Sequence, residues 1–226
     1  MRIAVYGVAQ PAEARWLESA GADVIGLVVD DRANGRILDM ASAKSVADAV
    51  DQAAVCVELR ENGSALAVAR GLAARWVQVP WNLPAAREWR EELAAGGIGW
   101  TLGRVPADED DDPEWITRRW TEYGDPAPDW VQVEIFPNLT DGWPILQEPS
   151  PDEVDATDLD QMAAERPILF SLPLTADRAG PARALLPHAH GFGLTLADRA
   201  DRADLHLAAT TVELDAALHI IEALRR

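Results

Sequence analysis

The chain has 226 residues, 48% of them hydrophobic, and a formal net charge of −18 that arises from 38 Asp and Glu against 20 Lys and Arg. This hydrophobic content is sufficient for a buried core and excludes an intrinsically disordered chain. The single cysteine, Cys56, excludes a disulfide scaffold and a thiolate zinc site. Because so negative a field repels phosphate backbones and anionic lipids, we expect no nucleic-acid partner and no membrane partner.

Apolar runs and helical stretches alternate along the whole chain. In chain order, strands are expected at residues 2–8, 23–29, 53–59, 76–79, 98–105, 130–136, 167–172 and 191–196. Helices are expected between and after them, at residues 11–20, 40–50, 64–73, 84–95, 113–123, 152–165, 177–186 and 212–226. Such alternation indicates parallel strands joined by crossover helices. An open doubly wound sheet would need only about five strand–helix units, so we predict an α/β fold, a (β/α)₈ TIM barrel, as a single domain over residues 1–226.

One short pattern occurs twice. Trp76-Val77-Gln78-Val79 recurs as Trp130-Val131-Gln132-Val133, on the fourth and sixth expected strands. Since side chains alternate between the two faces of a strand, each Trp shares a face with its Gln. If that face points inward, the two Trp fill the lower barrel and the two Gln form the layer above; the alternative is chance similarity between two short strands.

No apolar run reaches the roughly 18 residues of a membrane span. The first residues, MRIAVYGVAQ, lack the layout of a signal peptide. We therefore expect a cytoplasmic protein.

Two stretches resemble a known family. Residues 19–28 (SAGADVIGLV) and 35–39 (GRILD) are similar to the second strand and following loop of phosphoribosylanthranilate isomerase, a (β/α)₈ enzyme of tryptophan biosynthesis. Residues 6–13 (YGVAQPAE) are similar to the family's "CGIT-x-P-E-D" start, and residues 77–79 (VQV) lie where the family has "VQLHG". The resemblance implies a barrel, a small-molecule ligand at its mouth, and acid–base isomerisation without a cofactor.

The departures from the family concern its catalytic and phosphate-binding positions. The family's general-acid cysteine falls at Tyr6, and its catalytic aspartate aligns with Glu134. The glycines that end its seventh and eighth strands are replaced by residues 171–174 (SLPL) and 195–197 (TLA). Glycine lets a backbone approach a phosphate closely, and Pro173 removes an N–H donor. We therefore expect a ligand that is not phosphorylated.

Function in such barrels is located where the strands end, at the C-terminal face. The polar residues expected there are Tyr6, Asp30, Arg36, Glu58, Arg60, Gln78, Asn82, Arg104, Glu134, Asn138, Ser171, Thr195 and Asp198. Glu134 is the candidate base, because apolar strand neighbours desolvate its carboxylate and raise the pKa; the alternative is a structural ion pair with Arg104 or Arg36. Tyr6 is the candidate proton donor; the alternative is an aromatic plug in the barrel.

The remaining candidates would bind substrate: Arg36, Gln78, Trp81, Arg104 and Ser171. The family's equivalent of Arg36 holds the anthranilate carboxylate, although an exposed loop charge is the alternative here. Trp81 would wall a flat, apolar ligand. The acidic run at residues 108–112 is expected to be solvated, and His188 and His190 precede the eighth strand at the opposite end of the barrel, so we expect neither a metal nor a cofactor.

Three functions are compatible with these residues. The first is a divergent barrel enzyme, repurposed for acid–base isomerisation or elimination on a small, non-phosphorylated aromatic or carboxylate substrate. The second is genuine phosphoribosylanthranilate isomerase, and the third is a non-catalytic barrel used for binding or assembly. A homodimer is left open.

Overall fold

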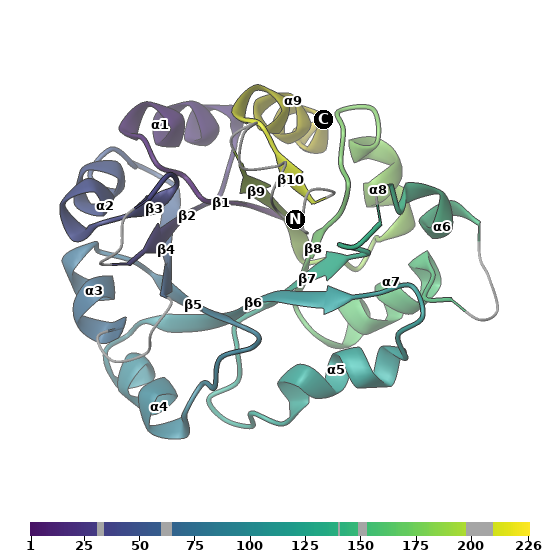
Figure 1. Ribbon diagram of the computed structural model, residues 1–226, viewed down its shortest axis with the longest axis horizontal. Helices are drawn as coiled ribbons and strands as arrows, with labels where there is room; N and C mark the ends of the chain where they lie inside the picture. Colours follow the sequence, from purple (N-terminus) through teal and green to yellow (C-terminus); the bar gives the residue numbers. More distant parts are fainter. Residues whose placement is uncertain (31–33, 60–64, 140, 149–152, 198–209) are drawn as a thin grey trace.

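The computed structural model describes residues 1–30, 34–59, 65–139, 141–148, 153–197 and 210–226, and it shows a closed barrel of eight parallel strands with helices around the outside (Figure 1). The barrel strands are β1 (Arg2–Tyr6), β2 (Val24–Val29), β4 (Ala54–Leu59), β5 (Trp76–Pro80), β6 (Gly99–Ala107), β7 (Val131–Ile135), β8 (Ile168–Ser171) and β9 (Gly191–Leu196). The predicted (β/α)₈ barrel is therefore confirmed.

Pairing between the first and last barrel strands closes the ring. β1 and β9 are in register over five residue pairs, from Arg2 opposite Gly191 to Tyr6 opposite Thr195. A side chain at Gly191 would bring its Cβ to 1.8 Å from the Arg2 carbonyl oxygen. Glycine at this position is thus what lets the two strands approach at the closing seam.

The helices follow the predicted order. They are α1 (Pro11–Ala20), α2 (Met40–Ala47), α3 (Ala65–Gly71), α4 (Arg87–Ala95), α5 (Pro113–Thr121), α7 (Ala156–Glu165), α8 (Ala179–Leu185) and α9 (Leu214–Arg225). The predicted bounds of α1 are matched at both ends. The predicted start of α7 at residue 152 was wrong, because the Asp155 carboxylate caps the helix by accepting hydrogen bonds from the Thr157 and Asp158 N–H groups at 2.7 and 3.0 Å.

Three short elements were not predicted. β3 (Ile37–Leu38) pairs with β2, β10 (Thr211–Val212) pairs with β9, and α6 (Trp143–Gln147) follows β7. Each is too short to show a hydrophobic period in the sequence. β3 and β10 lie beside the carboxyl ends of β2 and β9, and α6 follows the carboxyl end of β7, so all three are at the mouth of the barrel (Figure 1).

Side chains that point into the barrel form layers. In the lowest layer the Trp76 and Trp130 rings meet edge to face, with 4.6 Å between their centroids. One layer higher, the Gln78 Nε2 group donates to Gln132 Oε1 at 2.6 Å. The inward orientation expected from the repeated Trp-x-Gln pattern is thus confirmed. The larger apolar core lies outside the barrel, between the strands and the helices.

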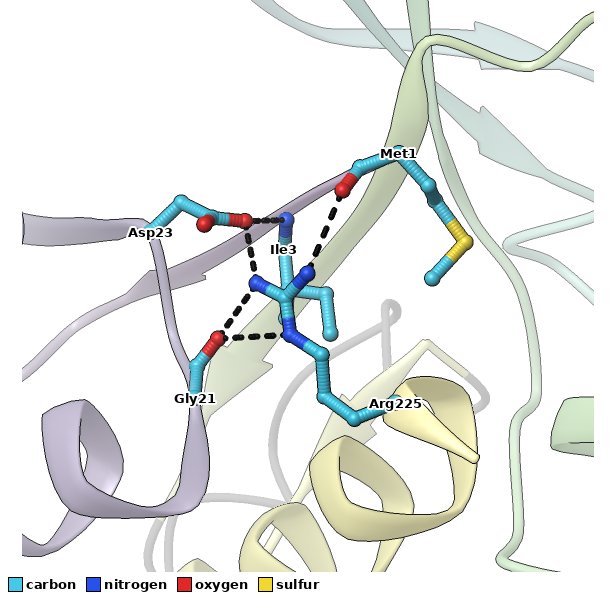
Figure 2. A network of polar contacts seen from close by, with 5 residues as sticks. All are labelled: Met1, Ile3, Gly21, Asp23 and Arg225. Carbon is cyan, nitrogen blue, oxygen red and sulfur yellow. Dashed lines mark hydrogen bonds and ion pairs between the residues drawn. The ribbon is translucent and has the colours of Figure 1, made fainter.

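Arg225 joins the end of the chain to its beginning (Figure 2). Its guanidinium donates to the Gly21 carbonyl oxygen at 3.0 Å from Nε and at 2.5 Å from Nη2, and Nη2 also contacts Asp23 Oδ2 at 2.5 Å. The same Asp23 oxygen accepts the Ile3 N–H at 2.7 Å, and Nη1 reaches the Met1 carbonyl oxygen at 3.4 Å. This network fixes α9 against the turn between α1 and β2.

None of the described helices is both long enough and apolar enough to cross a membrane.

Candidate active site at the mouth of the barrel

A cleft of about 550 Å³ opens at the carboxyl ends of β4, β5, β6 and β7. The described residues that line it are Glu58, Pro80, Trp81, Asn82, Leu83, Arg104, Pro106, Asp108, Glu134, Pro137 and Asn138. They include three carboxylates and one guanidinium. The cleft is therefore an acidic depression whose single cation, Arg104, lies among carboxylates.

Glu134 is one of the residues that line this cleft. It occupies the penultimate position of β7, where it is in register with Pro106 on one side and Ser171 on the other. The residue is only 2% exposed, yet its carboxylate forms no hydrogen bond and no ion pair with any residue that the structure describes. Burial raises the pKa of Glu134, with a further contribution from the nearby Glu58 charge, while Arg104 acts in the opposite direction.

Arg104 reaches the cleft because the backbone of β6 is irregular. Its register against β7 shifts between Leu102 and Val105, as in a β-bulge, and Arg104 itself has a φ of +58°. Non-glycine residues rarely adopt this left-handed conformation, and those that do are concentrated at functional sites. Arg104 Nε lies 3.6 Å from Glu58 Oε2, so its ion-pair partner is Glu58 and not Glu134.

Tyr6 lies deeper than the cleft. Its side chain is 1% exposed and packs with Ala4, Cys56 and Trp130 inside the barrel. Gly26 makes room for it, because a Cβ there would lie 2.3 Å from the Tyr6 ring. Burial raises the pKa of Tyr6 well above its ordinary value, and the neighbouring Trp130 indole opposes that effect only in part. The phenol therefore stays protonated.

Gln78 and Ser171 belong to a hydrogen-bonded chain across the barrel interior. Gln78 donates to Gln132, the Gln132 Nε2 group donates to Ser171 Oγ at 2.9 Å, and Ser171 Oγ donates to the Gly193 carbonyl oxygen at 2.9 Å. Gln132 precedes Glu134 by two residues on β7, so this chain lies one layer below the candidate base. Gly103 leaves room for it, since a Cβ at Gly103 would lie 2.3 Å from Gln78 Nε2.

Arg36 and Trp81 are placed differently. The Arg36 guanidinium contacts Glu13 Oε2 at 3.1 Å and donates to the Gly7 carbonyl oxygen at 3.0 Å, with the side chain only 14% exposed. Glu13 also accepts the Ala9 N–H at 2.9 Å, so Arg36 is fixed against the start of α1. Trp81, which is 36% exposed, lines the cleft directly after β5.

Of the predicted site residues, the structure thus brings three together in the cleft: Trp81, Arg104 and Glu134. Tyr6, Gln78 and Ser171 lie below it, and Arg36 lies outside its lining. Among the polar residues expected at the mouth, Arg60 and Asp198 lie outside the described residues.

Two charged residues of the cleft received no role from the sequence. Glu58 was placed at the mouth by its position near the end of a strand, but nothing in the sequence indicated its pairing with Arg104. Asp108 belongs to an acidic run that was expected to be solvated, and its carboxylate accepts an exposed hydrogen bond from Asn138 Nδ2 at 2.9 Å at the rim of the cleft. Asp108 and Asn138 follow the ends of the neighbouring strands β6 and β7. This placement was the sequence signal that could have indicated their contact.

No protein-family model and no curated protein matches the chain. Solved structures do. N-(5′-phosphoribosyl)anthranilate isomerase from Pyrococcus furiosus superposes with a TM-score of 0.70 at 13% identity, covering 100% of this chain and 98% of that chain. Monomers generated from the dimeric phosphoribosylanthranilate isomerase of Thermotoga maritima give 0.65 at 15% identity, covering 100% and 98%. The chain has the fold of these isomerases.

The similar structures include an enzyme that catalyses a different reaction. Thiamine phosphate pyrophosphorylase from Pyrococcus furiosus gives a TM-score of 0.59 at 12% identity, covering 99% of this chain and 95% of that chain. Because one barrel fold carries different chemistries, the likeness establishes the fold and not the reaction.

Proposed function

We propose that this phosphoribosylanthranilate isomerase-like barrel is an enzyme that performs cofactor-independent acid–base isomerisation or elimination on a small, non-phosphorylated aromatic or carboxylate substrate. One observation carries the proposal: Glu134 is a buried carboxylate with no hydrogen bond or ion pair among the described residues, and it faces an open cleft. A buried, unpaired carboxylate is costly for stability, and a raised pKa makes it a better base near neutral pH.

Three residues of the cleft have roles in this reaction. The Glu134 carboxylate takes a proton from a carbon next to a carbonyl or a protonated imine, and the electron pair left behind forms an enolate from the carbonyl or an enamine from the protonated imine. Arg104 stabilises the negative charge that develops on the oxygen, and Trp81 packs against a flat substrate. Return of the proton to the neighbouring atom completes an isomerisation, whereas departure of a leaving group completes an elimination.

Two observations support a substrate without a phosphate group. At the end of β8, Leu172 and Leu174 are buried on either side of Pro173, and the Leu174 N–H already donates to the Leu172 carbonyl oxygen at 2.7 Å. The turn therefore has few free N–H groups to offer an anion. In addition, the carboxylates of the cleft outnumber its single guanidinium and repel a dianion.

The buried position of Tyr6 supports a packing role more than a role as proton donor. Substitution of Tyr6 distinguishes these two roles. Replacement Tyr6→Phe keeps the ring and removes only the hydroxyl. Unchanged turnover would show that Tyr6 only fills the barrel interior, whereas a loss of turnover of about 100-fold would show that it acts as a general acid.

Deuterium exchange tests the proposal across a whole class of substrates at once. The protein is incubated in D₂O with a panel of small non-phosphorylated keto acids, imines and aromatic acids, and wash-in at carbon is followed by mass spectrometry. We expect enzyme-dependent exchange into at least one compound, reduced about 100-fold or more in Glu134→Gln. Glu88→Gln, the same change at an exposed position of α4, should exchange as the wild type does. Exchange that survives Glu134→Gln, or is absent throughout, contradicts the proposal.

The similar structures favour genuine phosphoribosylanthranilate isomerase as the second candidate. Complementation of a tryptophan auxotroph tests it, and growth at ordinary expression levels would replace our first proposal. A barrel that neither exchanges protons nor complements would be a binding or assembly protein. A homodimer is also proposed, with light scattering of the purified protein as its test.

A further inference from the structure

A second cavity, of about 410 Å³, lies at the opposite end of the barrel from the cleft. It is formed where strands begin, by Arg2 of β1 and Trp76 of β5 together with Arg75, Asp129 and His190. This is the N-terminal face, far along every strand from Glu134. Nothing in the proposed reaction uses it.

Two guanidiniums converge on one indole in this cavity. The Arg2 Cζ atom lies 5.0 Å from the centroid of the Trp76 ring and 4.7 Å from that of Trp130, and the Arg75 Cζ atom lies 4.7 Å from the Trp76 centroid. The aromatic faces hold both cations in place. One small ligand between them is therefore within reach of both.

Neither Arg2 nor Arg75 forms an ion pair with any residue that the structure describes. Asp129, the only carboxylate among the described lining residues, accepts a hydrogen bond from the Trp76 indole N–H at 2.7 Å. The lining therefore carries the two positive charges of Arg2 and Arg75 against the one negative charge of Asp129, in a chain whose net charge is −18. This local excess of positive charge attracts anions, although the net field of the chain opposes them.

The neighbouring backbone leaves the cavity open. Gly97 and Gly99 line it, and a Cβ at Gly99 would lie 2.0 Å from Asp129 Oδ2 and 2.5 Å from Trp76. Glycine there preserves the bond between Asp129 and Trp76, which keeps that carboxylate turned toward the indole. A Cβ at Gly97 would meet nothing within 4 Å, so the entrance is unobstructed on that side.

We propose that this cavity is a binding site for a small multivalent oxyanion of the phosphate or sulfate type, held between Arg2 and Arg75. Guanidinium groups bind such anions through paired N–H donors. The imidazole of His190 completes the lining. Burial, followed by the positive charges of Arg2 and the amino terminus, lowers the pKa of His190, and a bound anion would offset those charges.

Calorimetric titration with inorganic phosphate at constant ionic strength tests the site. We expect saturable binding to the wild type, weakened about tenfold in Arg75→Gln, which removes hydrogen bonds to a charged group at an exposed position. Arg15→Gln, on the exposed face of α1, removes the same charge from the chain and should leave the affinity unchanged. Glu134→Gln should also bind phosphate normally, which separates this site from the cleft.

Proton NMR locates the bound anion. Phosphate should raise the pKa of the His190 imidazole, assigned by its absence in His190→Gln, and the rise should be lost in Arg75→Gln. Absence of saturation, equal weakening in Arg15→Gln and Arg75→Gln, or phosphate binding without an effect on His190 would each overturn the proposal.

Discussion

Arg104 and Glu58 form an ion pair at the mouth of the barrel, with 3.6 Å between Nε and Oε2. The pairing crosses from β6 to β4 and leaves Glu134, on β7, without an ionic partner in the described part of the chain. Glu58 therefore anchors the guanidinium while Glu134 stays available for chemistry. Arg104 is close enough to oppose the rise in the Glu134 pKa, but burial dominates.

Two variants of Arg104 distinguish the effect of its guanidinium on turnover from the effect of its backbone conformation on stability. Both Arg104→Gln and Arg104→Gly should lower turnover about 100-fold or more, because both remove the group that stabilises the developing oxyanion. Arg104→Gly should nevertheless have a free energy of unfolding about 1 kcal/mol higher than Arg104→Gln, since a φ of +58° is strained for any residue with a Cβ. Urea unfolding and the exchange assay measure the two effects. Retained turnover in either variant would remove Arg104 from the mechanism.

The Gln132 side chain is expected to be structural. Replacement Gln132→Leu breaks two buried hydrogen bonds at once: it leaves Gln78 Nε2 without its acceptor and removes the donor to Ser171 Oγ, which keeps its bond to Gly193. We expect the free energy of unfolding to fall by about 2–3 kcal/mol. Gln147→Leu, at an exposed position of α6, should change it by less than about 0.5 kcal/mol. Equal, small effects in the two variants would show that the interior chain contributes little.

The Arg225 network should stabilise the closed barrel, because it fixes the last helix to the start of the chain. Arg225→Met keeps an apolar stem and removes the donors to Gly21 and Asp23. We expect a Tm lower by about 3 °C or more, given that 1 kcal/mol corresponds to about 2–4 °C in a chain of this size. Arg226→Met, at the exposed next position, serves as the control in the same thermal scan. A Tm equal to that of the control would mean that the Arg225 network does not contribute to stability.

Most of the fold was predictable from the sequence because each repeat carries its own signal. Buried strands appear as continuous apolar runs, and α1 is delimited by Pro11 at its start and Gly21 after its end. The two-residue strands β3 and β10 have no such signal, because their position depends on the neighbouring strand and not on their own composition.

The site was predictable only in part. The position of Glu134 near the end of a strand was enough to place it at the mouth. That the ion pair of Arg104 is with Glu58 and not with Glu134 was not predictable, because it depends on the bulge in β6. The depth of Tyr6 likewise depends on Gly26 of the adjacent strand, and a pairing between strands is not readable from either one alone.

The central claim is that burial of the Glu134 carboxylate outweighs the opposing charge of Arg104, since Glu134 has no hydrogen bond or ion pair with the residues that the structure describes, and the pH dependence of stability tests it directly. The folded protein raises the Glu134 pKa above its unfolded value, so the neutral form is favoured in the native state. The associated stabilisation is present below the ordinary carboxyl pKa and is lost as the pH rises through the raised value. Urea unfolding of the wild type and of Glu134→Gln over a pH series isolates this group, because the other titrating residues cancel in the difference.

We predict that the free energy of unfolding of the wild type, minus that of Glu134→Gln, decreases as the pH rises through this window. A difference that increases with pH would mean that Arg104 holds Glu134 as an ionised partner, and a flat difference would mean that the carboxyl is solvated. Either result would contradict the account.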